Sequence, residues 1–247
     1  MKVIYHDSFT QVYTHDPAAE PGRMEAIVAA IRDRAVFVEA TPASREQILL
    51  AHTRSHLDRV AAQGLCEIAA LAAGGAIQAA TIGLDEPAFG LIRPPGHHAS
   101  AGSSWGFCYF NNMAISVLHL KQKGLIRRAM VLDIDLHFGD GTVNILSGEE
   151  WVEVHNPSAR DRQEYLKEVE GALASAQVDI IGISAGFDFH QEDWGGLLTT
   201  EDYEIIGRRV RETGRASGGG CFAILEGGYN HRVLGVNAAA LLEGLAS

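Results

Sequence analysis

The chain of 247 residues is 47% hydrophobic and 21% charged, which is typical of a globular protein that buries a sizeable core. Acidic residues outnumber basic residues by 31 to 20, and the net charge of −11 argues against nucleic acid as a partner while it favours cationic ligands. The three cysteines are Cys66, Cys108 and Cys221. They form no CxxC pair, so the sequence predicts neither a disulfide framework nor a cysteine zinc cluster. A reducing, cytoplasmic location is expected.

The first residues, MKVIYHDSF, lack the long apolar stretch and the small-residue cleavage site of a signal peptide. The longest uncharged stretch, Ile68–Leu84, is rich in alanine and glycine and falls short of the ~20 strongly apolar residues that a membrane span needs. We therefore expect a buried helix over this stretch, and no membrane as a partner.

Short β-branched runs alternate along the chain with longer stretches of helical periodicity. The short runs predict strands at Val3–Tyr5, Val36–Glu39, Phe89–Ile92, Ala129–Ile134, Val152–His155, Ile180–Ser184 and Phe222–Leu225. The stretches between them predict helices at Glu20–Arg34, Ser44–His52, Ser55–Ile82, Asn112–Lys123, Arg162–Ala176, Thr200–Arg215 and Val233–Leu245. This alternation predicts an α/β protein, a single domain over residues 1–247 in which helices cover both faces of a parallel sheet.

Polar and glycine-rich segments follow four of the predicted strands. They are Arg93–Ala99, Asp135–Gly141, Ala185–Asp188 and Glu226–Asn230. Ligands of open parallel sheets bind where the chain leaves the carboxyl ends of the strands. The sequence therefore predicts that histidine, aspartate, tyrosine and glycine residues from these segments meet at one edge of the sheet.

Acidic and imidazole side chains alternate in the segment DIDLH. At strand periodicity Asp133, Asp135 and His137 share one face, and Asp188 follows a second strand. Three oxygen and nitrogen ligands with an open fourth position are typical of a catalytic zinc site. The alternative for this motif alone is structural, with aspartates that cap the next helix and a packed or solvated histidine.

Adjacent histidines, His97 and His98, lie in a loop that prolines and Gly96 restrict. Alone, such a pair is also compatible with a solvated loop. Together with Asp133 and Asp140, it indicates two imidazoles whose far nitrogens are each held by an acid, which sets their tautomer and basicity. One of the two histidines could then act as a general base.

Tyr229 follows two glycines, Gly227 and Gly228. An aromatic residue in such a turn is either a lid or packing residue, or a hydroxyl donor to a developing oxyanion. A donor of this kind contributes a few kcal/mol to lowering a barrier.

Five segments in this order, RPPGHHA, GFCYFNN, LDIDLHFGDGT, SAGFD and LEGGYN, resemble the histone deacetylase and acetylpolyamine amidohydrolase family. They extend from residue 93 to near the end, and EPGRMEAI and His52-Thr53 add weaker similarity. The resemblance implies the arginase/deacetylase α/β fold. It also implies hydrolysis of an acylated amine to acetate, or another short acid, and the free amine.

The resemblance implies roles for individual residues. A zinc ion, or Fe²⁺ in its place, would be bound by Asp135, His137 and Asp188. His97, held by Asp133, and His98, held by Asp140, would lie beside the attacking water. His98 would be the general base. Tyr229 would polarise the acyl carbonyl. The substrate channel would be lined by Phe107, Gly106 and Gly227, and a structural K⁺ ion would bind main-chain oxygens of Asp133, Asp135 and His137.

The sequence departs from this family in three places, one of which is the region His52–Ala80, where the long insertion that acetylpolyamine enzymes use to dimerise and constrict their entrance is missing. His137 and Asp188 are separated by only 50 residues (138–187), without the aromatic-Pro-Gly-Thr-Gly segment that forms the opposite channel wall; His155–Ser158 stands there instead. We therefore expect a channel that is open or completed by another subunit of an oligomer, and hence broad substrate acceptance. Glu153 stands where a small hydroxyl residue contributes to the potassium site.

Two other functions remain open at this stage. An arginase-like two-manganese hydrolase would share the fold, but it needs a further bridging acid where this chain has Gly139. A catalytically degenerate acyl-amine binding protein is the other alternative, and the intact ligand set and Tyr229 speak against it. Acyl-lysine and acetylpolyamine substrates are not separable from the sequence.

Overall fold

Seven strands form one parallel sheet in the computed structural model, which describes residues 1–174 and 176–247. In chain order they are β1 (Lys2–Tyr5), β2 (Val36–Glu39), β3 (Ala88–Gly90), β4 (Ala129–Asp133), β5 (Val152–His155), β6 (Ile180–Ala185) and β7 (Gly220–Leu225). Their order across the sheet is β2-β1-β3-β7-β6-β4-β5, and every neighbouring pair is parallel. The predicted α/β class and parallel sheet are confirmed, while the single domain stays a prediction.

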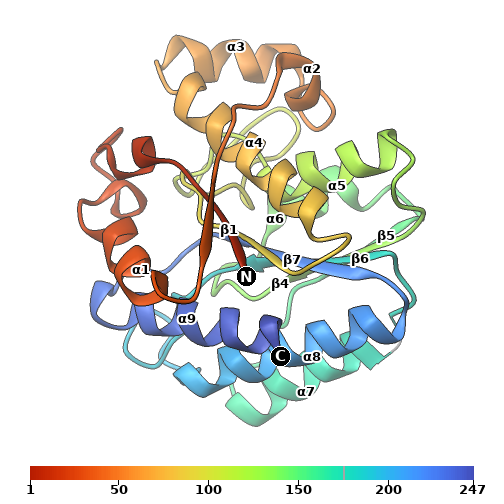
Figure 1. Ribbon diagram of the computed structural model, residues 1–247. Helices are drawn as coiled ribbons and strands as arrows, with labels where there is room; N and C mark the ends of the chain where they lie inside the picture. Colours follow the sequence, from red (N-terminus) through yellow and green to blue (C-terminus); the bar gives the residue numbers. More distant parts are fainter. Residues whose placement is uncertain (175) are drawn as a thin grey trace.

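Helices cover both faces of the sheet (Figure 1). One face carries α1 (Arg23–Ile31), α7 (Arg162–Ala174), α8 (Thr200–Ala216) and α9 (His231–Ala246). The other carries α4 (Cys66–Ile82), α5 (Asn112–Gln122) and α6 (Asp140–Leu146), with α2 (Arg45–Ile48) and α3 (Arg54–Ala62) beyond α4. Two short 3₁₀ helices precede α1, at Asp7–Thr10 and Pro17–Ala19.

Burial along the strands explains their hydrophobic patterns. All residues of β4, β6 and β7 are buried, because these strands lie inside the sheet and are covered on both faces. Strand β2 lies at the edge of the sheet, and three of its four residues are exposed. Continuous apolar runs such as IIGISA therefore mark the interior of the sheet.

The uncharged stretch that the sequence assigns to a buried helix forms α4, and this prediction is confirmed. A Cβ atom at Gly74 would overlap the backbone of Thr41–Ala43, and one at Gly75 would lie 2.8 Å from a methyl group of Ile92. Small residues thus let α4 lie close to the sheet and its loops. No helix among the described residues is long and apolar enough to cross a membrane.

The helix predicted over Ser55–Ile82 is wrong as one element. The chain forms α3 and α4 instead, with Gly64 between them in the left-handed region at φ +75°. Apolar periodicity continues across this break, which is why the sequence pattern did not show it. The helix expected from Glu20 begins at Arg23, since Gly22 has φ +85°, and the helix expected over Ser44–His52 ends at Ile48.

Helix α6 was not predicted from the sequence. It is a short helix that begins at Asp140, and the glycines beside this residue read as a loop in the sequence. Its position matters for the site, because it brings Asp140 from the end of β4 to the histidine loop.

The four polar, glycine-rich segments named in the sequence analysis come after β3, β4, β6 and β7. These strands are neighbours in the sheet, in the order β3-β7-β6-β4. Their carboxyl ends therefore lie at one edge, as the sequence predicts, and the candidate site is built there.

Candidate active site

Three side chains with metal-ligand chemistry converge at the ends of β4 and β6. Ligand atoms of Asp135, His137 and Asp188 all lie within 4.8 Å of one another. Nδ1 of His137 is 3.3 Å from Oδ1 of Asp135 and 3.1 Å from Oδ2 of Asp188. The structure thus brings together the three residues that the sequence proposes as ligands.

Backbone donors hold the two carboxylates of this cluster in place. The N–H groups of His137 and Gly227 donate to Oδ1 and Oδ2 of Asp135, at 2.9 and 2.8 Å, and that of Leu136 donates to Oδ1 of Asp188 at 3.1 Å. A Cβ atom at Gly227 would lie 2.8 Å from Oδ2 of Asp188, so only glycine permits this approach. Gly227 therefore orients the Asp135 carboxylate and lets the Asp188 carboxylate approach closely.

The chemistry of this cluster fits a divalent cation. Hydrogen bonds to Asp135 and Asp188 raise the pKa of His137 to about 10, so the two carboxylates stabilise a positive charge at its Nδ1. Burial and the neighbouring Asp135 charge raise the pKa of Asp188 to about 6, which a cation at this point would relieve. Two carboxylates and one imidazole suit Zn²⁺ and Fe²⁺ alike.

His97 is buried beside two carboxylates. Its Nδ1 lies 3.1 Å from Oδ2 of Asp133, and its Nε2 lies 3.8 Å from Oδ1 of Asp135. Burial disfavours the imidazolium, but the charges of Asp135 and Asp133 outweigh it and raise the pKa of His97 well above its ordinary value. The geometry brings together His97 and Asp133 as the resemblance implies.

His98 has a different electrostatic environment. Its Nδ1 lies 2.7 Å from Oδ1 of Asp140, yet burial and the adjacent His97 lower its pKa to about 4. Trp105 stacks on the His98 ring, with centroids 3.9 Å apart, and donates its indole N–H to the other oxygen of Asp140 at 2.9 Å. His98 is therefore neutral at physiological pH, with Nε2 free of Asp140.

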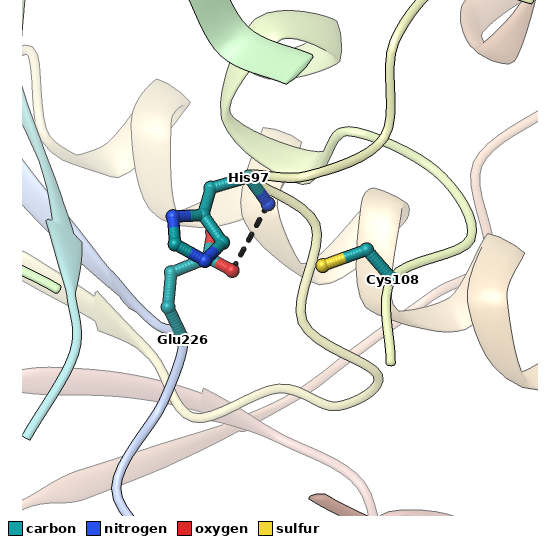
Figure 2. Close-up of side chains that lie close together, drawn as sticks. All are labelled: His97, Cys108 and Glu226. Atoms are coloured by element: carbon teal, nitrogen blue, oxygen red, sulfur yellow. Dashed lines mark hydrogen bonds between the residues drawn. The ribbon is translucent and has the colours of Figure 1, made fainter. Parts of the chain in front are cut away.

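Glu226 is a site residue to which sequence reasoning gave no role. It is fully buried after β7, and its Oε2 accepts the backbone N–H groups of Gly96 and His97 at 2.7 and 3.2 Å, the latter drawn in Figure 2. Burial raises the pKa of Glu226 to about 7. The carboxylate thus fixes the backbone of the histidine loop to the end of β7.

Cys108 lies beside His97 and Glu226, and the three form a second group of possible ligand atoms (Figure 2). The group is less suited to a metal, because Oε2 of Glu226 already accepts two N–H groups and burial raises the pKa of the Cys108 thiol well above its ordinary value. All three cysteines carry free thiols, as the sequence predicts.

Tyr229 follows β7 and is held from several sides. Its backbone N–H donates to Oδ2 of Asp193 at 2.8 Å, and its ring stacks on Trp194 with centroids 4.1 Å apart. Arg23 of α1 reaches the same turn: its Nε donates to the carbonyl oxygen of Gly228 at 2.8 Å. Burial raises the pKa of Tyr229, so its hydroxyl stays protonated and able to donate.

A cavity of about 120 Å³ joins these residues. It is lined by Pro95, His97, His98, Trp105, Gly106, Phe107, His137, Trp194, Gly227 and Tyr229. Phe107, Gly106 and Gly227 all border this cavity, and their role as the lining of a substrate channel stays a prediction. Phe107 has φ +68°, rare for a residue with a side chain, and its ring meets the edge of the Tyr229 ring at 6.0 Å.

The second aromatic wall is missing from the segment where the family resemblance places it, but aromatic residues from other loops border the cavity. Trp105 and Trp194 line the cavity together with Phe107, and both are more than half exposed. Trp194 comes from the loop after β6, not from the segment in which the family resemblance places the missing wall. Trp105 stands directly before Gly106, and Trp194 stands six residues after Asp188, so a tryptophan beside glycine near a proposed site residue was the signal available in the sequence.

The potassium site stays a prediction. Glu153, which replaces a small hydroxyl residue there, points to solvent with 58% of its side chain exposed. Its carboxylate lies 3.3 Å from Nε2 of His155.

His52 holds two backbone segments near the site together, at Ser100 and at Asn111. This buried ring bridges two backbone groups: Nδ1 lies 3.0 Å from the carbonyl oxygen of Ser100, and Nε2 accepts the N–H of Asn111 at 2.8 Å. The neutral Nδ1–H tautomer satisfies both, whereas the protonated ring cannot accept. Burial and the nearby His56 accordingly lower the pKa of His52 to about 4.

This pKa predicts a loss of stability in acid. Because the ordinary pKa of histidine is near 6.5, the unfolded chain binds a proton at His52 more readily than the folded chain. The contribution of His52 is complete above pH 6.5 and declines as the pH falls towards 4. We expect His52→Gln, which keeps one donor and one acceptor, to reduce the difference in unfolding free energy between pH 7.5 and pH 4.5 by about 2–3 kcal/mol.

Urea unfolding of both proteins at the two pH values measures this difference. His119→Gln is the control, because His119 lies on the far part of α5 and is less buried. An equal pH dependence in wild type and His52→Gln would contradict the role of His52.

Comparisons with known proteins agree on one family. The model of the histone deacetylase domain matches residues 17–157 and 150–245. A probable deacetylase of Methanothermobacter thermautotrophicus is 30% identical over 98% of this chain and 90% of its own length. A probable deacetylase of Archaeoglobus fulgidus is 32% identical over 88% of this chain and 74% of its own length.

Two further comparisons concern substrate and fold. The acetylpolyamine amidohydrolase of Mycoplana ramosa is 29% identical over 64% of this chain and 56% of its own length. The crystal structure of the HDA15 HD domain superposes with a TM-score of 0.85 at 23% identity, over 99% of this chain and 89% of that one. The match to the histone deacetylase domain and the 30% identity to the probable deacetylase of Methanothermobacter thermautotrophicus show that the chain belongs to the histone deacetylase family.

Proposed function

We propose that this protein is a metal-dependent amidohydrolase that removes the acyl group of an acylated amine. One observation carries the proposal: the Asp135, His137 and Asp188 cluster, the His97–His98 pair and Tyr229 come from four neighbouring strand ends, and His137, both histidines of the pair and Tyr229 border one cavity. Relatives named as deacetylases and amidohydrolases support a hydrolase.

Asp135, His137 and Asp188 would hold the metal ion. When bound, a Zn²⁺ or Fe²⁺ ion supplies Lewis-acid polarisation of the acyl oxygen and makes water more acidic. Backbone N–H groups hold the two carboxylates and so orient them towards His137.

The histidine pair would move the proton. His98 is neutral and its Nδ1 is held by Asp140, so its Nε2 can accept a proton from the attacking water. His97, whose pKa its carboxylate neighbours raise, would carry the positive charge that stabilises the developing anion. One of the two histidines, in its protonated form, then delivers a proton to the leaving amine nitrogen.

Tyr229 would donate its hydroxyl hydrogen to the acyl oxygen as that oxygen gains charge. The aromatic cavity walls suit a slender alkyl chain between the acyl group and the body of the amine. Both acyl-lysine and acetylpolyamine substrates have such a chain. The net charge of −11 favours a cationic carrier, which is a property of polyamines.

An arginase-like centre with two manganese ions is disfavoured by the structure around Gly139. A side chain there would overlap Oδ2 of Asp133, so a further bridging acid does not fit without displacing the residue that holds His97. A degenerate binding protein would not need the two histidine–aspartate pairs and a protonated tyrosine beside the ligand set.

Metal analysis combined with product release tests the proposal. Purified protein should contain about one Zn²⁺ or Fe²⁺ ion per chain and release acetate from an acetyl-lysine peptide or N-acetylspermidine. Chelation should abolish the release, and stoichiometric metal should restore it. Two ions per chain would favour the arginase-like alternative, and fully metal-loaded protein that hydrolyses no acylated amine would refute the proposal.

A further inference from the structure

A second cavity of about 120 Å³ lies on another side of His137. It is lined by Asp135, Leu136, His137, Phe138, Asn156, Pro157, Ser158, Arg160 and Phe189. His137 thus borders both this cavity and the channel with the histidine pair and Tyr229. We call it the Arg160 cavity. It lies where the short segment 155–158 replaces the longer one expected from the family resemblance.

Most of the accessible wall of the Arg160 cavity is apolar, and its free polar groups are the Arg160 guanidinium, the Asn156 amide and the Ser158 hydroxyl. Oδ1 of Asn156 accepts the N–H of Gly139 at 2.8 Å, which leaves the amide NH₂ group of Asn156 as its remaining polar group. The oxygens of Asp135 accept the backbone N–H groups of His137 and Gly227, and Asp135 belongs to the proposed metal-ligand set. A ligand in this cavity would therefore meet three donor groups: the Arg160 guanidinium, the Asn156 NH₂ group and the Ser158 hydroxyl.

Arg160 supplies the positive charge of this cavity. Its guanidinium carbon lies 5.4 Å from the centre of the Phe189 ring, which is buried. Within the described residues, no carboxylate lies within 4.0 Å of it, whereas neighbouring Arg162 is paired with Asp202 at 2.6 Å. The ring holds the guanidinium at the cavity while its donor groups stay available.

We propose that the Arg160 cavity binds a carboxylate of the acylated-amine substrate, an inference that rests on the proposed function. A planar guanidinium pairs with a carboxylate through two parallel hydrogen bonds, and the Asn156 amide can add a third. The apolar walls accommodate a few methylene groups between that carboxylate and the amide at His137. The volume matches about four water molecules at roughly 30 Å³ each, which limits this group to a short chain.

Two kinds of substrate carry such a carboxylate. In one, the acyl group is a short dicarboxylic acid such as succinate; in the other, the amine carrier is an amino acid with a free α-carboxylate. Matched neutral partners exist for both: an N-butanoyl amide for the N-succinyl amide, and Nε-acetyl-lysine amide for Nε-acetyl-lysine. Each pair differs in the carboxylate while the scissile amide is kept.

The test compares kcat/KM within each pair for wild type, Arg160→Gln and Arg209→Gln. Arg209 is the matched control, an exposed arginine of α8 with 50% of its side chain accessible. We expect Arg160→Gln to lower the ratio of the carboxylate substrate to its neutral partner by roughly 10- to 100-fold in one pair, the scale of a hydrogen-bonded charge pair. Arg209→Gln should leave the ratio unchanged. The pair that responds identifies the acyl or the carrier side.

Calorimetric binding of succinate to the metal-loaded protein gives a readout without turnover. Its affinity should weaken by a similar factor in Arg160→Gln, and that of acetate should not. Unchanged ratios in both pairs together with unchanged succinate affinity would overturn the carboxylate site. If no amide is hydrolysed, the proposed function fails, while the succinate affinities still decide whether the Arg160 cavity binds carboxylates.

Discussion

Asp188→Asn is expected to abolish metal binding and lower the rate of amide hydrolysis by about three orders of magnitude or more, since a bound ion supplies several kcal/mol of transition-state stabilisation and each 1.36 kcal/mol is tenfold in rate. Asparagine has the shape of aspartate and keeps an acceptor for the N–H of Leu136. It removes the charge that faces Nδ1 of His137. Metal content by mass spectrometry and acetate release measure the two effects.

Asp179→Asn is the matched control for this substitution. Asp179 precedes β6 whereas Asp188 follows it, and its carboxylate also accepts backbone N–H groups, those of Arg127 and Arg128. The control should retain metal and activity. Full metal content in Asp188→Asn would show that Asp188 is not a ligand.

Tyr229→Phe is expected to lower kcat by roughly 10²- to 10³-fold with little change in metal content or stability, the effect of removing one oxyanion donor. No described residue hydrogen-bonds the Tyr229 hydroxyl, so its removal leaves no buried partner unpaired. Phenylalanine also retains the stack on Trp194. KM should change less than kcat, because the donor acts mainly in the transition state.

Tyr203→Phe is the matched control, because it also removes a tyrosine hydroxyl but at a residue that does not line the active-site cavity. Tyr203 is fully buried on α8, and its hydroxyl has no partner among the described residues. Its rate should equal that of wild type. A Tyr229→Phe enzyme as fast as wild type would make Tyr229 a packing residue, and the role carried over from the family would be wrong.

The position of the site could be predicted from the sequence because strand ends carry a local signal. Apolar runs such as that before Asp133 predict buried strands, and polar residues directly after them must lie at the sheet edge. The order of strands in the sheet has no such signal. It is this order that makes β3, β7, β6 and β4 neighbours and brings His97 to Asp133.

Residues whose partners are distant in sequence were missed. Glu226 is 129 positions from His97, whose N–H it accepts, and nothing near Glu226 in the sequence points to that contact. Trp105 and Trp194 contact His98 and Tyr229 through ring stacking, which leaves no periodic pattern. The positions of these residues also depend on loop conformations, which hydrophobic periodicity does not predict.

The position of β7 has a consequence for how the chain folds. Strand β7 is the last along the chain, yet it pairs with β3 on one side and β6 on the other, so it alone joins β2-β1-β3 to β6-β4-β5. Until β7 is synthesised, the edges of β3 and β6 that pair with it stay unpaired. Such late, long-range pairing slows folding and makes the nascent chain prone to aggregate. Chaperone dependence during expression is the expected result.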